Sequence, residues 1–418
     1  MEGQSKSGPL TNVYAIHYSE IALKGKNRPE FVRILRRNLK RAVAALGEAT
    51  VESREGRVIL ETKGEASQVE SALSKVFGVA WFAKASMVER DYESIRSAVI
   101  DGAKKEEGSF KVAARRSDKS FPIGSMELGR RLGEEVIEQT GRPAQLSDPS
   151  TTIHVDVLHD HALVYAAKTQ GPGGLPVGTG GRVAHLFSGG IDSPVAAWLL
   201  MKRGCRPVYV HFYLAPSPDY ALESKVARIM RLLTDYSGRS SLMLIPFAEY
   251  QLATAGAPSD SEPSLFRRFM RVTAEELAST FGASAVSTGD SLSQAASQTL
   301  WNMAVFDSGS NYPVLRPLLG YDKEEIVQLA KKIGTYEPSI EEYRDCCAII
   351  TRHPKTRVKR ELIDSLSESL GFPALAKRCI ALGTLAQFDR RNPGPEVTPL
   401  QEIIERRKLH VRQSVAGK

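Results

Sequence analysis

Apolar positions in the C-terminal half of the chain form short continuous runs that alternate with helically spaced stripes. The short runs, bounded by turn residues, predict buried strands at residues 183–187, 207–214, 242–247 and 285–288. Apolar residues that recur on one helical face predict helices at 193–203, 221–233, 265–280 and 324–333. Strands and helices in alternation indicate an α/β fold with a parallel sheet covered on both faces.

The N-terminal half shows a less regular order of elements. Residues 13–75 predict a strand, a helix, two strands and a helix, and the first helix carries an apolar stripe through Ile34, Leu35 and Leu39. Beyond residue 76, helices are predicted at 92–104 and 126–140, with strands at 110–114, 153–157 and 162–167. We therefore expect two α+β domains at 1–75 and 76–170, a Gly- and Pro-rich linker at 171–182, an α/β domain at 183–375 and a tail at 376–418.

The composition is that of a globular protein, because 42% of the 418 residues are hydrophobic and 25% are charged. No apolar run is long enough to span a bilayer, and the N-terminus lacks the apolar stretch of a signal peptide. Four cysteines in a chain of this length do not make a disulfide framework. We therefore expect a cytoplasmic protein with no membrane partner.

Positive charge is concentrated in the N-terminal half, although the net charge of the whole chain is only +8. One basic cluster follows residue 20, and a second begins in the predicted strand at 110. A solvated helix face is the alternative explanation for the first cluster, but two clusters beside aromatic residues favour RNA. The candidate RNA contacts are Lys24, Lys26, Arg28, Lys111, Arg115, Arg116 and Lys119.

The strand at 183–187 runs into a glycine turn that opens a helix, with the sequence Ser188-Gly189-Gly190-Ile191-Asp192-Ser193. Such a turn directs backbone N–H groups and the positive end of the helix dipole to one point, which favours a phosphate group. No Gly-Lys-Ser/Thr ends the loop, so it is not a Walker P-loop. A purely structural strand–turn–helix corner is the alternative. The pattern resembles the PP-loop of ATP pyrophosphatases, which cleave ATP between its α- and β-phosphates.

Several further motifs, taken in order along the chain, resemble those of the tRNA 4-thiouridine synthetase (tRNA uridine sulfurtransferase) family. They lie at residues 19–28, 110–121, 287–299, 315–318, 333–336 and 345–347. The resemblance implies a ferredoxin-like domain at 1–75, an RNA-binding THUMP domain at 76–170 and a PP-loop ATP pyrophosphatase domain at 183–375. Asp290 and Ser293 depart from the family pattern, which has Glu and Gly at these positions, and Cys205 occupies a usually apolar position.

The resemblance also implies a reaction in two steps. ATP, with Mg²⁺ on its phosphates and not in a protein cage, adenylates O4 of uridine 8 in tRNA. A persulfide sulfur on an enzyme cysteine then displaces AMP and leaves 4-thiouridine. The catalytic residues that the resemblance implies are Cys346, Asp192 and Lys323. The implied ATP contacts are Leu186, Phe187, Ser188, Gly189, Gly190, Asp192, Ser193, His211, Phe212, Arg267, Gly289 and Gln298.

Three of these side chains also have an ordinary structural explanation. Asp192 suits a helix cap, Lys323 a solvated surface position, and His211 the core at the end of a strand. Taken without the resemblance, the surface position is the better explanation for Lys323.

The cysteines differ in their expected roles. Cys346 aligns with the family's sulfur-carrying cysteine, and its polar neighbours predict an exposed thiol of lowered pKa. Cys347 is the alternate sulfur carrier. Cys205 is expected to be a small buried residue, and Cys379 has no assigned role.

The partners follow from the same resemblance. The segment after residue 375 is too short for a rhodanese domain with a second sulfur-carrying cysteine. We therefore expect a separate cysteine desulfurase as persulfide donor, in addition to tRNA. A further role in supplying sulfur for thiamine thiazole and a homodimeric state are left open. The alternative functions are another PP-loop tRNA-modifying adenylating enzyme and a non-catalytic THUMP RNA-binding protein.

Overall fold

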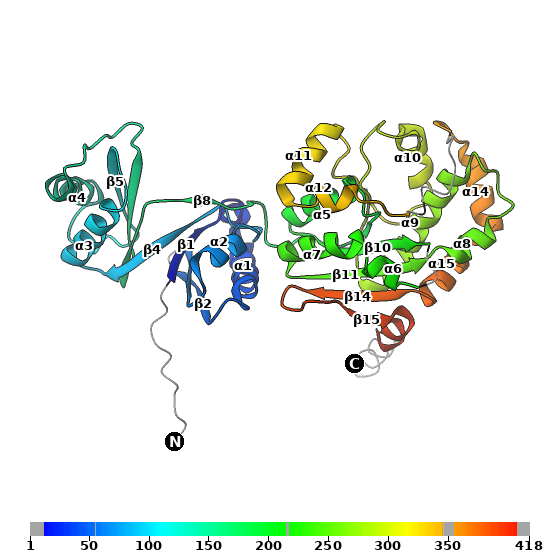
Figure 1. The fold of residues 1–418 in the computed structure, drawn as a ribbon, viewed down its shortest axis with the longest axis horizontal. Helices are drawn as coiled ribbons and strands as arrows, with labels where there is room; N and C mark the ends of the chain where they lie inside the picture. Colours follow the sequence, from blue (N-terminus) through cyan, green and yellow to red (C-terminus); the bar gives the residue numbers. More distant parts are fainter. Residues whose placement is uncertain (1–11, 55, 215–216, 345, 347–354, 408–418) are drawn as a thin grey trace, which may run out of the picture. The chain divides into compact units, whose positions relative to one another are not determined.

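The chain divides between Pro176 and Val177 into two units, and each unit contains one β-sheet (Figure 1). The computed structural model describes residues 12–54, 56–214, 217–344, 346 and 355–407. Unit 1 is the part up to Pro176, and unit 2 is the part from Val177 onward.

Unit 1 contains a sheet with the strand order β2-β3-β1-β4-β7-β6-β5, and β8 pairs with β4. Its strands are β1 (Asn12–His17), β2 (Ala49–Arg54), β3 (Arg57–Thr62), β4 (Trp81–Glu89), β5 (Phe110–Arg116), β6 (Thr151–Val157), β7 (His161–Tyr165) and β8 (Thr169–Gln170). Its helices are η1 (Glu20–Asn27), α1 (Arg28–Val43), α2 (Ala66–Leu73), α3 (Tyr92–Ala103) and α4 (Ser125–Thr140).

Strand β4 joins the two halves of this sheet. Residues 81–85 pair with β1, and residues 86–89 pair with β7. Each half has its own apolar core under its own helices, with Leu35 and Leu39 of α1 in the first and Leu128 and Leu132 of α4 in the second. The two α+β patterns expected at 1–75 and 76–170 therefore share a single sheet.

Unit 2 contains a seven-stranded sheet with the order β13-β12-β9-β10-β11-β14-β15. Its strands are β9 (Arg182–Leu186), β10 (Arg206–Tyr213), β11 (Arg239–Pro246), β12 (Val286–Ser287), β13 (Val314–Leu315), β14 (Thr384–Asp389) and β15 (Glu396–Pro399). Its helices are α5 (Asp192–Lys202), α6 (Asp219–Leu222), α7 (Lys225–Ser237), α8 (Ala248–Ala253), α9 (Glu262–Phe281), η2 (Ala296–Gln298), α10 (Leu300–Asp307), α11 (Lys323–Ile333), α12 (Tyr336–Ile340), α14 (Arg360–Ser369) and α15 (Phe372–Ala381).

The central strands of unit 2 are parallel and buried on both faces, as predicted. β9 pairs in parallel with β10 and β12, and β10 with β11. In β11, Met243 and Ile245 face the cluster formed with α9, whereas the alternate residues Leu242 and Leu244 are equally buried on the other side. Continuous apolar runs in this half thus reflect two covered faces rather than one.

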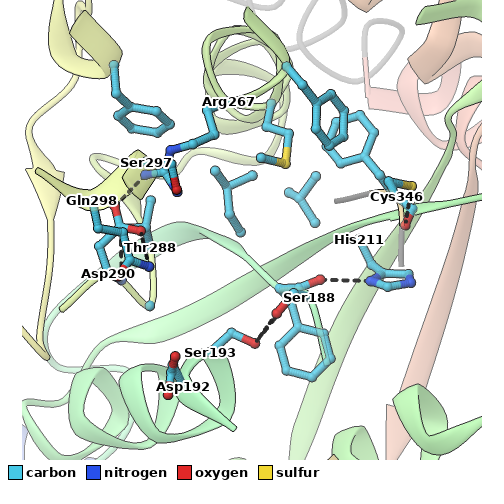
Figure 2. Close-up of a pocket in the computed structure, with 18 residues that line it drawn as sticks. Ser188, Asp192, Ser193, His211, Arg267, Thr288, Asp290, Ser297, Gln298 and Cys346 are labelled. Atoms are coloured by element: carbon cyan, nitrogen blue, oxygen red, sulfur yellow. Dashed lines mark hydrogen bonds and ion pairs between the residues drawn. The ribbon is translucent and has the colours of Figure 1, made fainter. Parts of the chain in front are cut away.

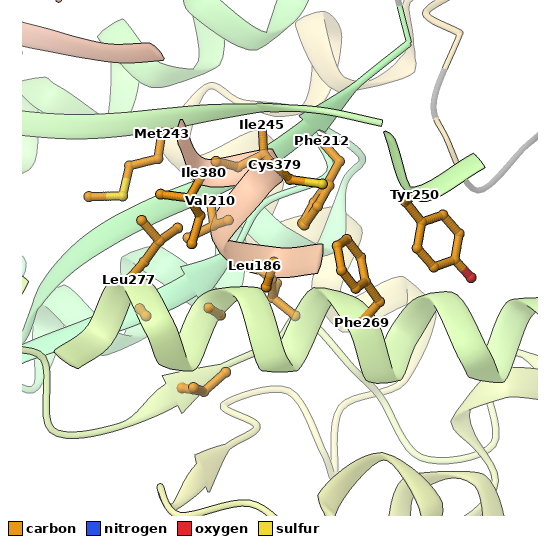
Figure 3. Packing of buried hydrophobic residues seen from close by; sticks show 14 of the residues in the cluster. Leu186, Val210, Phe212, Met243, Ile245, Tyr250, Phe269, Leu277, Cys379 and Ile380 are labelled. Carbon is orange, nitrogen blue, oxygen red and sulfur yellow. The ribbon is translucent and has the colours of Figure 1, made fainter. Parts of the chain in front are cut away.

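Helix α9 forms the centre of the main core of unit 2 (Figure 3). Phe269 packs its ring 4.8 Å from Tyr250 and 5.2 Å from Phe372 of α15. Leu277, two turns further along the helix, contacts the same cluster. Gly282 ends the helix in the left-handed region with φ at +65°, a conformation that glycine adopts without strain. This packing fixes the position of α9 against the sheet.

Two segments of unit 2 differ from the sequence-based expectations. The helix expected at 221–233 begins as α6 and restarts as α7, because Ser224 caps the second helix by accepting from the backbone N–H of Val226. The segment expected to be a tail after residue 375 continues α15 to Ala381 and then pairs β14 antiparallel with β11. β14 and β15 thus complete the sheet. Among the helices described, none is both long and apolar enough to cross a membrane.

Replacement of Leu385 tests whether this terminal strand stabilises unit 2. Leu385 is 3% exposed and belongs to the core of α9. We predict that Leu385→Ala lowers the free energy of unfolding by about 2–5 kcal/mol, because it removes buried methyl groups and leaves a cavity. The matched control is Gln387→Ala, an exposed residue of the same strand, with an expected change within about 0.5 kcal/mol. Urea denaturation followed by circular dichroism measures both, and equal effects would contradict the prediction.

Candidate functional site

The predicted phosphate loop lies at the carboxyl end of β9 and leads directly into α5. Gly189 has a φ of +77°, which only glycine adopts readily, and it turns the chain toward the helix. The hydroxyl of Ser193 accepts from the backbone N–H of Ser188 at 3.2 Å, and the hydroxyl of Ser188 accepts from that of Gly190 at 3.2 Å. These bonds fix the loop as a tight concave turn at the helix N-terminus.

Asp192 is the first residue of α5, but its side chain does not cap the helix. Its carboxylate accepts from the Lys323 ammonium at 2.6 Å and from the Gln294 side-chain amide at 2.7 Å. Lys323 stands in the first turn of α11, which is fixed by a capping box between Asp322 and Glu325. The two predicted catalytic residues therefore touch each other, and the helix-cap explanation for Asp192 does not apply.

Gly289 brings a second loop against the phosphate loop. A Cβ at this position would lie 2.9 Å from the backbone nitrogen of Ser193, closer than side chains tolerate. Glycine is therefore needed for the chain after β12 to pack on the first turn of α5. Asp290, the next residue, is carried into the same space.

A cavity of about 310 Å³ lies between these loops, β10 and α9 (Figure 2). Most of the predicted ATP contacts line it. Gly189 and Gly190 belong to the adjacent loop without lining the cavity, and Lys323 reaches it through Asp192. The predicted residues in the lining are Leu186, Phe187, Ser188, Asp192, Ser193, His211, Phe212, Arg267, Gly289, Gln298 and Cys346.

A buried ionic network orients one wall of the cavity. Asp290 is 3% exposed and accepts from Arg267 at 2.6 Å and from the side-chain amide of Gln298 at 3.4 Å. Arg316 lies 3.4 Å from the same carboxylate and pairs with Asp307 at 2.6 Å. Burial alone would raise the pKa of Asp290, but the charge and hydrogen bond of Arg267 outweigh it and lower the pKa. Asp290 thus positions two of the predicted ATP contacts.

His211 links the phosphate loop to the segment that carries Cys346. Its Nδ1 lies 2.8 Å from the carbonyl oxygen of Phe187, and its Nε2 lies 2.9 Å from the hydroxyl of Tyr343. A carbonyl can only accept, so Nδ1 carries a proton and donates it to Phe187. Tyr220 stacks on Tyr343 with a ring separation of 5.3 Å. His211 is buried, as the structural explanation expects, and it also lines the cavity.

The exposure expected for Cys346 is wrong, because this residue is only 1% exposed. Its side chain packs into the apolar cluster shared by β10 and α9, and its Sγ donates to the carbonyl of Phe212 at 3.3 Å. Polar neighbours in sequence did not reveal this long-range packing. Cys346 nevertheless lines the cavity of the phosphate loop. Cys347 lies outside the described residues.

The remaining cysteines are held in structural positions. Cys205 is half-buried rather than buried, donates to the carbonyl of Gly180 at 3.5 Å, and has its pKa raised by burial. Cys379 is buried in the core of α9, and burial raises its pKa to about 11. Neither thiol lines the cavity of the phosphate loop.

The predicted RNA contacts all belong to unit 1, and several already hold local structure. Arg28 donates to the hydroxyl of Tyr18, Lys111 to the carbonyl of Leu146, and Arg116 to the carbonyl of Phe121. Lys24 lies 5.4 Å from the centre of the Phe31 ring. The solvent-facing members of the set are Lys26, Arg115 and Lys119.

A row of rings that was not predicted from the sequence crosses the sheet of unit 1. The His17 and Trp81 rings stack at 5.0 Å, and Tyr165 lies 5.8 Å from Trp81 and 5.1 Å from His154. The exposed Lys168 stands 4.8 Å over the Trp81 ring. Burial, then the charge of Lys168, lowers the pKa of His154 to about 4, so the ring is neutral near pH 7. The rings come from four neighbouring strands, which sequence spacing alone cannot bring together.

Comparison with known families matches three consecutive parts of the chain. Residues 13–83 match the ThiI ferredoxin-like domain, residues 90–167 the THUMP domain, and residues 178–372 the thiamine biosynthesis protein (ThiI) model. The fold class and family expected from the sequence motifs are confirmed.

Curated relatives and a solved structure agree with these matches. A probable tRNA sulfurtransferase of a Thermoanaerobacter species is 37% identical over 87% of this chain and 96% of its own length. One from Thermus thermophilus is 40% identical over 83% of this chain and 86% of its own. A 4-thiouridine synthetase crystallised with RNA and bound ATP has a TM-score of 0.83 at 33% identity, covering 90% of this chain and all of that one. This similarity over nearly the full length of the relatives shows that the chain belongs to the tRNA sulfurtransferase family and is an enzyme of this type.

Proposed function

We propose that this enzyme adenylates O4 of uridine 8 in tRNA and replaces it with sulfur to form 4-thiouridine. The observation that carries the proposal is that the phosphate loop and Cys346 line one cavity. The nucleotide that activates the base and the sulfur that attacks it act at the same carbon, so the phosphate loop and the thiol have to lie close together. The related 4-thiouridine synthetase that was crystallised with RNA and ATP supports the same pair of substrates.

The cavity fits ATP in both of its chemically distinct parts. The loop after β9 offers backbone N–H groups and the N-terminus of α5 to phosphates. The apolar rings of Phe187 and Phe306 suit a purine, and Arg267, 5.0 Å from the centre of the Phe306 ring, adds a cation to the lining. The side-chain oxygen of Gln298 is buried with no hydrogen-bond partner among the described residues. An adenine amino group would satisfy it.

Magnesium would be held chiefly by the phosphates of ATP. Among the described residues, no three His, Cys, Asp or Glu side chains gather to form a metal cage. Asp192 supplies a single carboxylate beside the phosphate loop, and its side chain is 20% exposed toward solvent. One or two carboxylates together with substrate phosphates are the usual ligands of Mg²⁺. When bound, the ion neutralises phosphate charge.

The first step converts a poor leaving group into a good one. O4 of uracil attacks the α-phosphorus of ATP, the bond to the bridging oxygen breaks, and pyrophosphate leaves. The C4 carbon then carries an AMP ester. Lys323, 2.6 Å from Asp192, brings a positive charge to the side of the loop where negative charge develops.

The second step uses the thiol of Cys346 after a cysteine desulfurase has loaded it with a persulfide sulfur. The terminal sulfur attacks C4 and expels AMP, which joins the enzyme to the base through an S–S bond. A low-molecular-weight thiol then attacks Cys346, so that the base keeps the thiocarbonyl sulfur and the thiol forms a mixed disulfide with the enzyme. The same persulfide would serve thiazole synthesis, a second role favoured by the family description as a thiamine biosynthesis protein.

Unit 1 supplies the proposed contacts with tRNA. Lys26, Arg115 and Lys119 point charge into solvent, as phosphate contacts require. The exposed Lys168, which stands over the Trp81 ring, adds a further cation to this surface.

Asp192→Ala tests the nucleotide half of the reaction. We predict that tRNA-dependent pyrophosphate release falls roughly 100-fold or more, because the variant loses the carboxylate beside the phosphate loop. The affinity for tRNA should stay unchanged, since the basic clusters lie in unit 1. Glu324→Ala, which removes an exposed carboxylate in the first turn of α11, is the matched control and should release pyrophosphate normally. Normal release by Asp192→Ala would exclude this role.

Cys346→Ser separates the two steps. The variant should still bind ATP and release pyrophosphate with tRNA, but it should form no 4-thiouridine in a desulfurase-coupled assay, because serine cannot carry a persulfide. Cys379→Ser removes a buried thiol outside the cavity and should lower stability without blocking either step. Cys347→Ser should be less damaging than Cys346→Ser. Mass spectrometry of tRNA nucleosides gives the result, and thiolation at the normal rate by Cys346→Ser would reject the assignment.

A fragment of residues 1–176 tests the role of unit 1 in RNA binding. It should bind tRNA with strong salt dependence, because lysines and arginines release counterions from phosphates. Replacing Lys111, Arg115 and Lys119 together with Gln should weaken binding and flatten the plot of log affinity against log salt by a slope of about 2–3. Arg130→Gln, whose side chain is paired with Glu127 and Glu134, should change neither. Salt-independent binding by the fragment would be the contrary result.

A further inference from the structure

Each of the three central strands of unit 2 begins with an arginine. Arg182 opens β9, Arg206 opens β10 and Arg239 opens β11. These strands are adjacent and parallel, and Arg182 and Arg206 are direct register partners. The three side chains therefore stand in a row at the amino edge of the sheet. The phosphate loop and its cavity lie at the opposite, carboxyl edge.

This row lines a second pocket of about 360 Å³. Arg391, just after β14, and Arg407, near the end of the described chain, add two further guanidinium groups to the lining. Ser240 and Phe388 form a buried floor. The lining contains five arginines against only two carboxylates, those of Asp389 and Glu396.

Four of the five arginines are held by a shared carboxylate or by uncharged carbonyls. Asp389 pairs with both Arg239 at 2.7 Å and Arg391 at 2.8 Å, so one carboxylate serves two cations. Arg182 and Arg407 donate to the carbonyls of Phe281 and Thr280 at the end of α9. Those carbonyls are dipoles and carry no full charge. Burial and the nearby charge of Arg182 lower the pKa of Arg407, as expected where cations crowd together.

We propose that this pocket binds a small polyphosphate anion, of the size of pyrophosphate or the phosphate chain of a nucleotide. Guanidinium forks that converge from several strands match the oxygens of such an anion, each through paired N–H donors. The hydroxyls of Ser240 and Ser241 and the amide of Asn392 offer further neutral donors. The pocket has the volume of a small-molecule site, and its walls come from strands and from the end of α9. It would be a second anion site, separate from the reaction cavity.

A backbone phosphate of RNA shares this chemistry, but an RNA strand is contacted along an extended basic track. The arginines here instead line one hollow together with the buried residues Ser240 and Phe388. We therefore assign the pocket to a free anion, with RNA as an outcome that the test distinguishes.

The test uses the full-length chain and inorganic pyrophosphate as the probe, measured by isothermal titration calorimetry. Arg206→Gln/Arg239→Gln should weaken pyrophosphate binding about tenfold or more, because two charge-assisted contacts are lost. Pyrophosphate release and 4-thiouridine formation at low pyrophosphate should match the wild type. Arg360→Gln, which removes an exposed arginine paired with Asp364, is the matched control.

Three results bear on the outcome. Loss of affinity in the double variant, with an unchanged control and an unchanged melting temperature, supports the site. An isotherm identical to the wild type means that pyrophosphate binds elsewhere, including the phosphate loop, and overturns it. Weaker tRNA binding with unchanged pyrophosphate binding also overturns it and identifies an RNA contact.

A second variant, Arg391→Gln, changes an exposed residue of the same pocket and is measured in parallel. It decides the result if the double variant loses affinity only because it unfolds. This variant keeps all three strand-opening arginines. It should weaken pyrophosphate binding several-fold. If the double variant melts early and Arg391→Gln binds normally, the proposal fails.

Discussion

The site of unit 2 depends on one close approach of backbone to backbone. Because Gly289 has no side chain, the loop after β12 can lie against the first turn of α5, where a Cβ would come within 2.9 Å of the nitrogen of Ser193. Ser193 holds the phosphate loop closed by accepting from Ser188, and Asp290 follows Gly289 directly and holds Arg267. The two loops therefore set the geometry of the cavity together. A larger residue at 289 would separate them and disturb both walls at once.

The architecture of unit 2 was largely predictable because its signal is local. β9, β10 and β11 are apolar on both faces, and their runs of apolar residues are unambiguous. The terminal strand β14 was not predicted because it is defined by antiparallel pairing with β11, in which Asp389 pairs with Arg239, 150 residues away. In unit 1, the role of β4 as a shared strand was invisible for the same reason, since its partners come from distant parts of the sequence.

The candidate site shows the same division between local and long-range information. The phosphate loop is a continuous motif, so its position could be predicted from the residues alone, whereas the other lining residues were implied by the resemblance to the family. The burial of Cys346 could not, because the surrounding sequence is polar while the side chain packs against β10. The ionic network around Asp290 and the arginine row of the amino edge were also missed. Both consist of single charged residues on separate elements, and only the sheet brings them together.

The single strand β4 gives unit 1 a mechanical property. Its nine residues extend about 30 Å, with β1 bonded along the first part and β7 along the second. The basic residues near η1 and those near β5 are therefore mounted on one continuous frame rather than on two bodies joined by a hinge. The distance between these two groups of basic residues is therefore set by the length of β4. Under the proposed function, RNA whose phosphates match this spacing would bind and RNA that has to bend to reach both groups would be disfavoured, so the shape of a folded tRNA would contribute to its recognition.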